Sequence, residues 1–282
     1  MRKLLCLRLL AALLACTGLV TAVDAEPIRF PSAVAPPTPL QLRLARERGL
    51  PAPEPSAGQA LVGELYRPSG EGRFPAVVLL HGCDGRLSSA GEQREAQKLV
   101  ALGYVVLAVD SFGPRGVRHR CAQEFGAPVD RVMDAYGALQ YLASRADIEA
   151  DRVAVLGYSQ GAMTAISAVT RGGVETLFER HFRAAVAYYP GCDNTEVAAP
   201  TLILIGALDE WTPTRNCREM IASQSGAGAP VELFVYSGAY HAFNFPRDRP
   251  AEYFGHRLEY NEAADRAAWS ETTRFLRQNL GR

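Results

Sequence analysis

Short apolar runs alternate with amphipathic segments along the chain from residue 59 onward. Continuous apolar runs of this length are typical of strands buried on both faces of a parallel sheet. We expect strands at residues 60–66, 75–80, 104–109, 153–156, 184–189, 201–205 and 231–236. Helices are expected at residues 92–102, 129–145, 214–224 and 262–280, and directly after the strand at 153–156. This alternation predicts an α/β fold, with a mostly parallel central sheet and helices on both faces.

The N-terminus has a different pattern. Arg2 and Lys3 precede an apolar run at residues 4–14, which is the arrangement of a secretion signal, here assigned to residues 1–25. The run is too short to be read first as a membrane span. An alternative is a lipoprotein signal with lipidation of Cys16, because Leu-Leu-Ala precedes this cysteine. We therefore expect an exported protein, periplasmic or secreted, with no stable membrane span in the mature chain.

Residues 26–58 are rich in proline. We expect an extended arm over the domain surface, with a short helix near residues 40–48. Residues 59–282 then form one globular domain, which suits a chain of 282 residues. The formal net charge is +0 at pH 7, and this neutrality argues against a nucleic-acid partner.

Export changes the interpretation of the cysteines. Cys83, Cys121, Cys192 and Cys217 follow the signal, and an even number in an oxidising compartment indicates two disulfides. Of the three possible pairings we favour Cys83–Cys121 and Cys192–Cys217, because each pair joins loops at one edge of the predicted sheet. Their wide spacing does not favour a metal site, so no metal is expected.

The segment Gly157-Tyr158-Ser159-Gln160-Gly161 lies between a predicted strand and a predicted helix. A turn this tight places its central residue above the sheet edge, in the manner of a nucleophile elbow. Ser159 is the candidate nucleophile. The alternative is an exposed serine in a glycine-rich connection.

A serine hydroxyl needs a neighbouring base, and that base needs an orienting acid. Asp209 and His241 follow two later strands, in the order Ser, Asp, His. We expect Ser159 to attack an acyl carbon, His241 to carry the proton and Asp209 to orient the imidazole. Glu210 is the alternative acid, and Asp209 could instead be a helix cap.

A tetrahedral intermediate also needs hydrogen-bond donors for its oxyanion. We expect these to be the backbone N–H groups of Gln160, directly after the nucleophile, and Cys83, in the loop after the strand at 75–80. His81 is expected to be a structural or pocket-shaping residue, with a second base as the alternative. A disulfide at Cys83 would rigidify the loop that carries the second donor.

Several segments carry a resemblance to known proteins: Val78-Leu79-Leu80-His81-Gly82, the turn at 157–161, the loop of Asp209, and Ala239-Tyr240-His241-Ala242-Phe243. Together they resemble the α/β-hydrolase superfamily and, within it, the dienelactone hydrolase family. Residues 110–116 look like a variant found in exported members. The resemblance covers residues 59–280 and implies the α/β-hydrolase fold.

Two departures from the family pattern bear on the substrate. The enzyme that named the family has a cysteine where this chain has Ser159. It also has a glutamate in the oxyanion loop and arginines that bind the substrate's carboxylate, whereas Phe245 stands here four residues after His241. Arg115 and Arg118 are candidates for contact with an acidic substrate or are solvated loop residues. These departures favour ester hydrolysis over dienelactone hydrolysis.

The leading hypothesis is a serine hydrolase that cleaves carboxylic esters or lactones through an acyl-enzyme on Ser159, with a small-molecule substrate and no cofactor. Alternatives are a peptidase of the same superfamily and a non-catalytic binding protein on a hydrolase scaffold. Aromatic residues near the predicted site suggest a partly aromatic pocket, although most of them could be core. They are Phe112, Tyr158, Tyr188, Tyr240 and Phe243.

Overall fold

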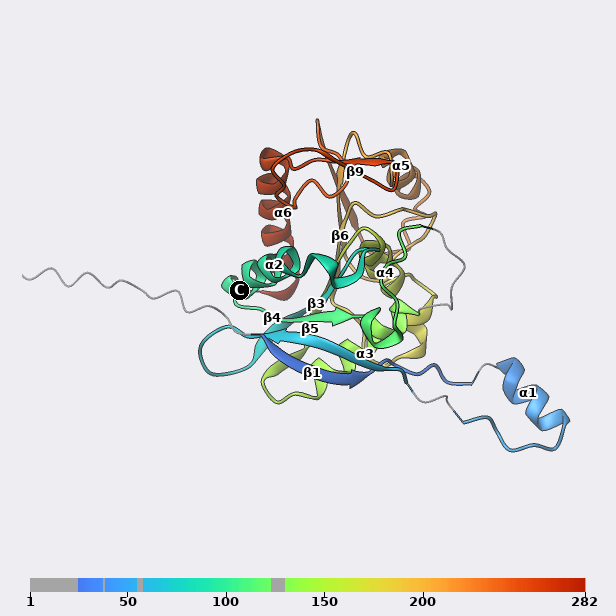
Figure 1. The fold of residues 1–282 in the computed structure, drawn as a ribbon. Coiled ribbons are helices and arrows are strands. Elements are labelled where there is room, and N and C mark those ends of the chain that lie inside the picture. The colour runs from blue at the N-terminus through green and yellow to red at the C-terminus, as the bar shows by residue number, and fades with distance from the viewer. Residues whose placement is uncertain (1–24, 38, 55–57, 123–129, 282) are drawn as a thin grey trace, which may run out of the picture.

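A computed structural model describes residues 25–37, 39–54, 58–122 and 130–281 (Figure 1). The predicted signal segment up to residue 24, including Cys16, lies outside the described residues. Within the described part of the chain, no helix is long and apolar enough to cross a membrane.

The fold is built on an eight-stranded sheet in the order β1-β2-β4-β3-β5-β6-β7-β8. The strands from β4 to β8 across the sheet are parallel, and β2 and β1 are added antiparallel at one edge. Their bounds are β1 Glu26–Pro31, β2 Ala60–Tyr66, β3 Phe74–Leu80, β4 Val105–Asp110, β5 Ile148–Tyr158, β6 Ala184–Tyr188, β7 Thr201–Gly206 and β8 Val231–Tyr236. Every strand predicted from residue 60 onward is present, so the expected mostly parallel sheet is confirmed.

Helices cover both faces of this sheet (Figure 1). Helix α2 (Ser89–Ala101) and helix α6 (Glu262–Leu280) lie together, since Lys98 is 3.8 Å from the Asp265 carboxylate. Helices α3 (Arg131–Ser144) and α4 (Gln160–Ala168) also lie together, and the Tyr136 hydroxyl donates to the Ala168 carbonyl at 2.8 Å. The remaining helices are α1 Pro39–Glu47, α5 Thr214–Ala222 and the 3₁₀ turns η1 Gly85–Ser88, η2 Gly113–Arg115 and η3 Val174–Leu177. The expected α/β layering is confirmed.

The proline-rich arm differs from its prediction. Its first residues form β1, in which Ile28 and Phe30 point inward and are buried. Pro27 and Pro31 lack an N–H donor, which is tolerated at the edge of a sheet. Helix α1 is where a short helix was expected, but it projects from the domain (Figure 1) rather than lying over its surface.

Parallel pairing aligns the carboxyl ends of the central strands. Leu80 lies opposite Gly157, and Tyr158 lies opposite Tyr188. The loops that follow β3, β5, β6, β7 and β8 therefore meet at one edge of the sheet, where open α/β sheets place their ligands. A short hairpin that the sequence pattern did not predict reaches the same edge. It consists of β9 (Ala251–Tyr253) and β10 (His256–Leu258), and Leu258 forms a parallel bridge with His241.

Candidate active site

The turn after β5 holds Ser159 in a backbone conformation that side chains rarely adopt. Its φ is 52° and its ψ is −119°. The Ser159 N–H donates to the Tyr188 carbonyl at 2.9 Å, which ties the turn to β6. A positive φ at a non-glycine residue is strained, and such residues cluster at active sites.

Two glycines allow this turn to close. A Cβ on Gly157 would lie 2.1 Å from the Gly161 carbonyl oxygen. A Cβ on Gly161 would lie 2.4 Å from the Leu80 carbonyl oxygen of β3. Both separations are shorter than real Cβ contacts, so any side chain here would push α4 away from the sheet.

The structure brings Ser159, His241 and Asp209 into one hydrogen-bonded chain. The His241 Nε2 lies 3.0 Å from the Ser159 Oγ, and its Nδ1 lies 2.8 Å from the Asp209 Oδ2. His241 and Asp209 are only 3% and 4% exposed. Because the carboxylate faces Nδ1, the neutral imidazole carries its proton there and presents the Nε2 lone pair to the serine.

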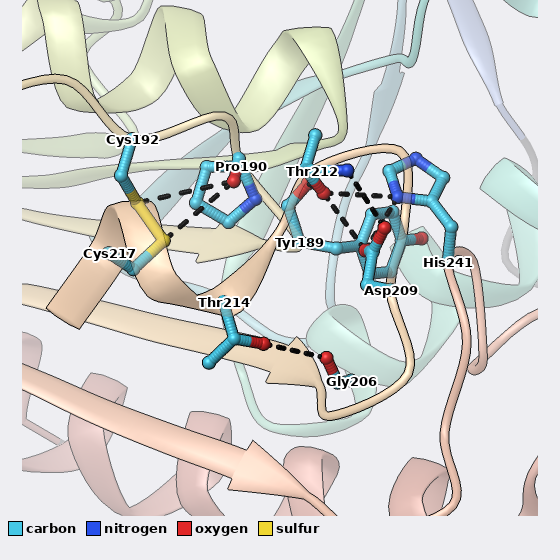
Figure 2. The surroundings of a disulfide bond; sticks show 9 residues. All are labelled: Tyr189, Pro190, Cys192, Gly206, Asp209, Thr212, Thr214, Cys217 and His241. Atoms are coloured by element: carbon cyan, nitrogen blue, oxygen red, sulfur yellow. Dashed lines mark hydrogen bonds and ion pairs between the residues drawn. A yellow bond between two sulfur atoms is a disulfide. The ribbon is translucent and has the colours of Figure 1, made fainter.

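Asp209 is held by its own loop as well as by His241 (Figure 2). Its Oδ1 accepts hydrogen bonds from the backbone N–H groups of Trp211 and Thr212, at 3.0 and 2.9 Å. Its Oδ2 accepts a hydrogen bond from the Thr212 hydroxyl at 2.9 Å. These bonds fix the plane of the carboxylate toward the imidazole.

Both expected disulfide pairs are joined in the structure, Cys83–Cys121 and Cys192–Cys217. The second lies near the acid loop, where its sulfur atoms approach the Pro190 carbonyl at 4.0 and 3.8 Å (Figure 2). It links the loop after β6 to helix α5. The Cys83–Cys121 bond anchors the loop after β3, and the Arg120 N–H also donates to the Cys83 carbonyl, at 2.6 Å.

The two candidate oxyanion donors come from the segments next to the nucleophile. Among the described residues, neither the Gln160 N–H nor the Cys83 N–H has a backbone acceptor. The two segments are close, since a Cβ placed on Gly82 would be 3.8 Å from the Ser159 Cβ. Unsatisfied N–H groups flanking a nucleophile have the arrangement that an oxyanion needs.

His81 belongs to the supporting structure and not to the reacting groups. Its Nδ1 lies 2.7 Å from the Gly82 carbonyl, and its Nε2 accepts a hydrogen bond from the Ser111 N–H at 3.3 Å. Burial, reinforced by the nearby Arg131 guanidinium, holds the pKa of His81 well below its usual range. The ring is therefore neutral and fixes the loop after β3 through these backbone contacts.

Ser159 and His241 open onto a cavity of about 740 Å³. Tyr158, Tyr189, Trp211, Phe245 and Tyr253 give it aromatic walls. Its charged lining residues are Asp84, Glu92, Arg94 and Arg247. Burial raises the pKa of Asp84 and lowers the pKa of Arg247, although each group's charge partly offsets the effect on the other.

A model of the dienelactone hydrolase family matches residues 61–280 of this chain. The chain belongs to the dienelactone hydrolase family. This membership confirms the expectation of a carboxylic ester hydrolase.

Individual family relatives are distant. A protein of Bradyrhizobium sp. named "Probable 2-oxo-3-(5-oxofuran-2-ylidene)propanoate lactonase" is 26% identical over 242 residues, which are 79% of this chain and 91% of the relative. The solved structure of a protein called m3DLH has a TM-score of 0.69 at 20% identity, covering 92% of this chain and 99% of that one. Esterase 2 of Thermogutta terrifontis has a TM-score of 0.59 at 19% identity, covering 77% and 88%. At these identities the structural likeness shows the fold.

Most of the residues expected to contact an acidic substrate or to form an aromatic pocket do not line this cavity. Arg115 is held by both Asp134 carboxylate oxygens at 2.8 Å and cannot reach a ligand there. Phe112 is buried against the His81 ring, and Tyr240 lies under the Arg257 guanidinium. Tyr188 and Phe243 are buried in the core, and Arg118 is exposed outside the cavity lining. Of all these residues, Tyr158 lines the cavity.

The sequence reasoning missed other lining residues. Trp211 lies 5.0 Å, between ring centroids, from His241 and stacks on His256 of the hairpin at 4.6 Å. Arg247 follows His241 by six residues. The sequence indicated these two residues only by position, because Trp211 lies close to Asp209 in the chain and Arg247 lies close to His241.

Proposed function

We propose that this protein hydrolyses carboxylic esters or lactones through an acyl-enzyme on Ser159. The observation that carries the proposal is the chain of hydrogen bonds from the Ser159 Oγ through His241 to Asp209. A serine in this arrangement is activated as a nucleophile by the adjacent base.

We assign the following roles to these residues. The Ser159 oxygen attacks the acyl carbon while His241 Nε2 takes its proton, and the carbonyl electrons move onto the oxygen that the Gln160 and Cys83 N–H groups face. Collapse of the intermediate expels the alkoxide, which His241 protonates. Water then attacks the acyl-enzyme by the same route, with His241 again as base, and Asp209 stabilises the imidazolium in both halves.

Arg247 extends the proposal to the substrate. Within the described part of the chain it makes no hydrogen bond or ion pair, and its Nε is buried without a partner. An unpaired guanidinium in a partly desolvated cavity is suited to a carboxylate or another oxygen acceptor. We therefore favour esters or lactones that carry an acidic group, and the Bradyrhizobium lactonase name is in keeping with this class.

A fluorophosphonate probe and a panel of p-nitrophenyl esters test the reaction. The wild type should be labelled and should hydrolyse the esters, and Ser159→Ala should do neither. Ser167→Ala, on the exposed side of the same helix, is the matched control and should behave as wild type. Equal labelling of Ser159→Ala, or no labelling of the wild type, would favour a binding protein instead.

Export is part of the proposal. Disulfides persist in oxidising compartments, and two are present here. Fractionation of cells that express the full chain should find the protein outside the cytoplasm, with an N-terminus near residue 26. Retention in the cytoplasm would contradict export, and a lipid-modified Cys16 would replace the proposed cleavage site.

A further inference from the structure

Arg131 is a buried arginine beneath the candidate oxyanion hole. It is the first residue of helix α3 and is 6% exposed. Its Nη2 donates to the His81 carbonyl at 2.6 Å and lies 3.4 Å from the His81 Nδ1. Its Nη1 donates to the Gln160 Oε1 at 3.2 Å, and its guanidinium lies 5.1 Å from the Phe112 ring centroid.

Fold stability does not account for a charge at this position. No carboxylate in the described part of the chain forms an ion pair with Arg131. The carboxylates of Asp134 and Glu92 are paired with other arginines, Arg115 and Arg86. Its Nε is buried and has no hydrogen-bond partner among the residues that the structure describes. A cation at the N-terminal end of a helix is also disfavoured by the helix dipole. A buried charge without a direct counter-ion reduces stability.

Arg131 nevertheless remains a cation. Burial lowers its pKa to about 10, while the more distant carboxylates of Asp134, Glu92 and Asp84 oppose this shift. At neutral pH the guanidinium is therefore charged. Because the interior has a low effective dielectric, its field reaches groups beyond its own hydrogen-bonding distance.

The two residues that Arg131 holds belong to the two segments that carry the candidate oxyanion donors. Gln160 supplies one donor from its own N–H. His81 precedes by two residues the Cys83 N–H that supplies the other. One guanidinium thus joins the start of α4 to the loop after β3, and fixes the spacing between their N–H groups.

We propose that Arg131 is a positioning residue that sets the geometry of the oxyanion hole and places a fixed positive charge behind it. The inference rests on the proposed acyl transfer at Ser159. Arg131 acts through Gln160 and His81, since its contacts are made to them. The charge favours the tetrahedral intermediate, whose oxygen gains the electron pair of the carbonyl bond, over the neutral ester.

The decisive variant is Arg131→Met, which keeps the length of the side chain and removes its charge and hydrogen bonds. We expect kcat for a p-nitrophenyl ester to fall by about 10–100-fold, somewhat less than the loss of a direct oxyanion donor. KM should change by less than about threefold, because the neutral ground state does not need the charge. An arylboronic acid, which forms a negative tetrahedral adduct with serine, should bind more weakly by a similar factor.

Stability separates positioning from simple packing. Arg131→Met should unfold at a temperature close to that of the wild type, because removal of a buried charge without a counter-ion offsets the loss of its hydrogen bonds to His81 and Gln160. Arg131→Lys keeps the charge without the planar fork and should recover part of kcat. Arg145→Met, just beyond the other end of α3 and paired with Asp147, is the control and should leave kcat unchanged.

Several outcomes would overturn the inference. The first is an Arg131→Met variant with the kcat of the wild type. The second is a fall in kcat with no change in the affinity for the boronic acid. The third is a fall in kcat that is proportional to the fraction of unfolded protein. If Arg131→Met does not fold, Gln160→Met replaces it. That variant removes one contact and should lower kcat severalfold at constant KM, whereas an unchanged kcat would count against the inference. Fluorophosphonate labelling of the wild type separates the test of Arg131 from the test of the proposed function. Only a failure of this labelling would contradict acyl transfer at Ser159.

Discussion

The Thr212 hydroxyl donates to the same Asp209 oxygen that faces His241, at 2.9 Å. The Thr212 Oγ also lies 3.2 Å from the His241 Nδ1 and 3.1 Å from the Tyr189 carbonyl oxygen. A hydroxyl has one proton and two lone pairs. It can therefore donate to the carboxylate while it accepts a share of the imidazole N–H, which makes Thr212 a fourth member of the proposed catalytic chain.

Thr212→Val should lower kcat/KM about tenfold, because a hydrogen bond to a charged group contributes about 1.5–3 kcal/mol and part of it is replaced by the backbone donors to Asp209. Thr212→Ser keeps the hydroxyl and should stay within about threefold of the wild type. Steady-state hydrolysis of a p-nitrophenyl ester measures both. Equal activities of the valine variant and the wild type would exclude the role.

Arg247→Met should separate acidic from neutral substrates. For an ester with a free carboxylate we expect KM to rise by about 10–100-fold, the effect of losing one charge-assisted hydrogen bond. A neutral ester of similar size should keep its KM. Arg249→Met, whose side chain is exposed, is the control. A parallel rise in KM for both esters would show that Arg247 shapes the cavity without recognising charge.

The two disulfides should affect function differently. In the chain-entropy model, closures of 38 and 25 residues each contribute roughly 3–4 kcal/mol to stability. Replacing either pair with alanines should therefore lower the free energy of unfolding by similar amounts in urea titrations. Loss of the Cys83–Cys121 pair should also reduce kcat of the folded enzyme, because Cys83 carries a proposed oxyanion donor. A larger effect on kcat from the Cys192–Cys217 pair would contradict this assignment.

Glu92 should make stability depend on pH near neutrality. Burial raises its pKa to about 7, although Arg86 opposes the shift. Its folded pKa is above its unfolded value, so the native state binds the proton more tightly between about pH 4.5 and 7. Stability from this group is present below that window and is lost as the pH rises through it.

Glu92→Gln imitates the protonated form and should remove this dependence. Relative to the wild type, its free energy of unfolding should rise by about 1–3 kcal/mol between pH 5 and 8, since one pKa unit corresponds to about 1.4 kcal/mol. Urea unfolding at several pH values measures this difference. Glu71→Gln, at an exposed position, should show no such trend, and a Glu92→Gln curve parallel to the wild type would disprove the shift.

The central fold could be predicted because its strands are buried on both faces. Every residue of β3 and β7 is buried, so each appears in the sequence as an uninterrupted apolar run. The elbow could be predicted because its geometry is local, with the glycines and the serine inside five consecutive residues. The sequence allowed Asp209 to be either a helix cap or a catalytic acid. In the structure, its carboxylate accepts hydrogen bonds from its own loop and also contacts the His241 imidazole.

Other features depend on contacts that no local pattern records. β1 has only two inward side chains, and the strands of the β9–β10 hairpin have three residues each, which is too short for a detectable period. The sequence around Arg115 and Arg131 does not indicate which groups either side chain contacts. Arg115 pairs with Asp134, nineteen residues on, whereas Arg131 reaches His81 and Gln160, and only the folded chain distinguishes their partners.

β1 also protects the sheet from self-association in solution, because it covers an edge strand. It occupies the hydrogen-bonding edge of β2 from Glu26 to Pro31, directly after the segment assigned to the signal. Trimming by a protease beyond this strand would leave β2 as an open edge, available to strands of other molecules. If the proposed signal is removed near residue 26, β1 stays in place, whereas a cut a few residues further along the chain should produce a protein that self-associates.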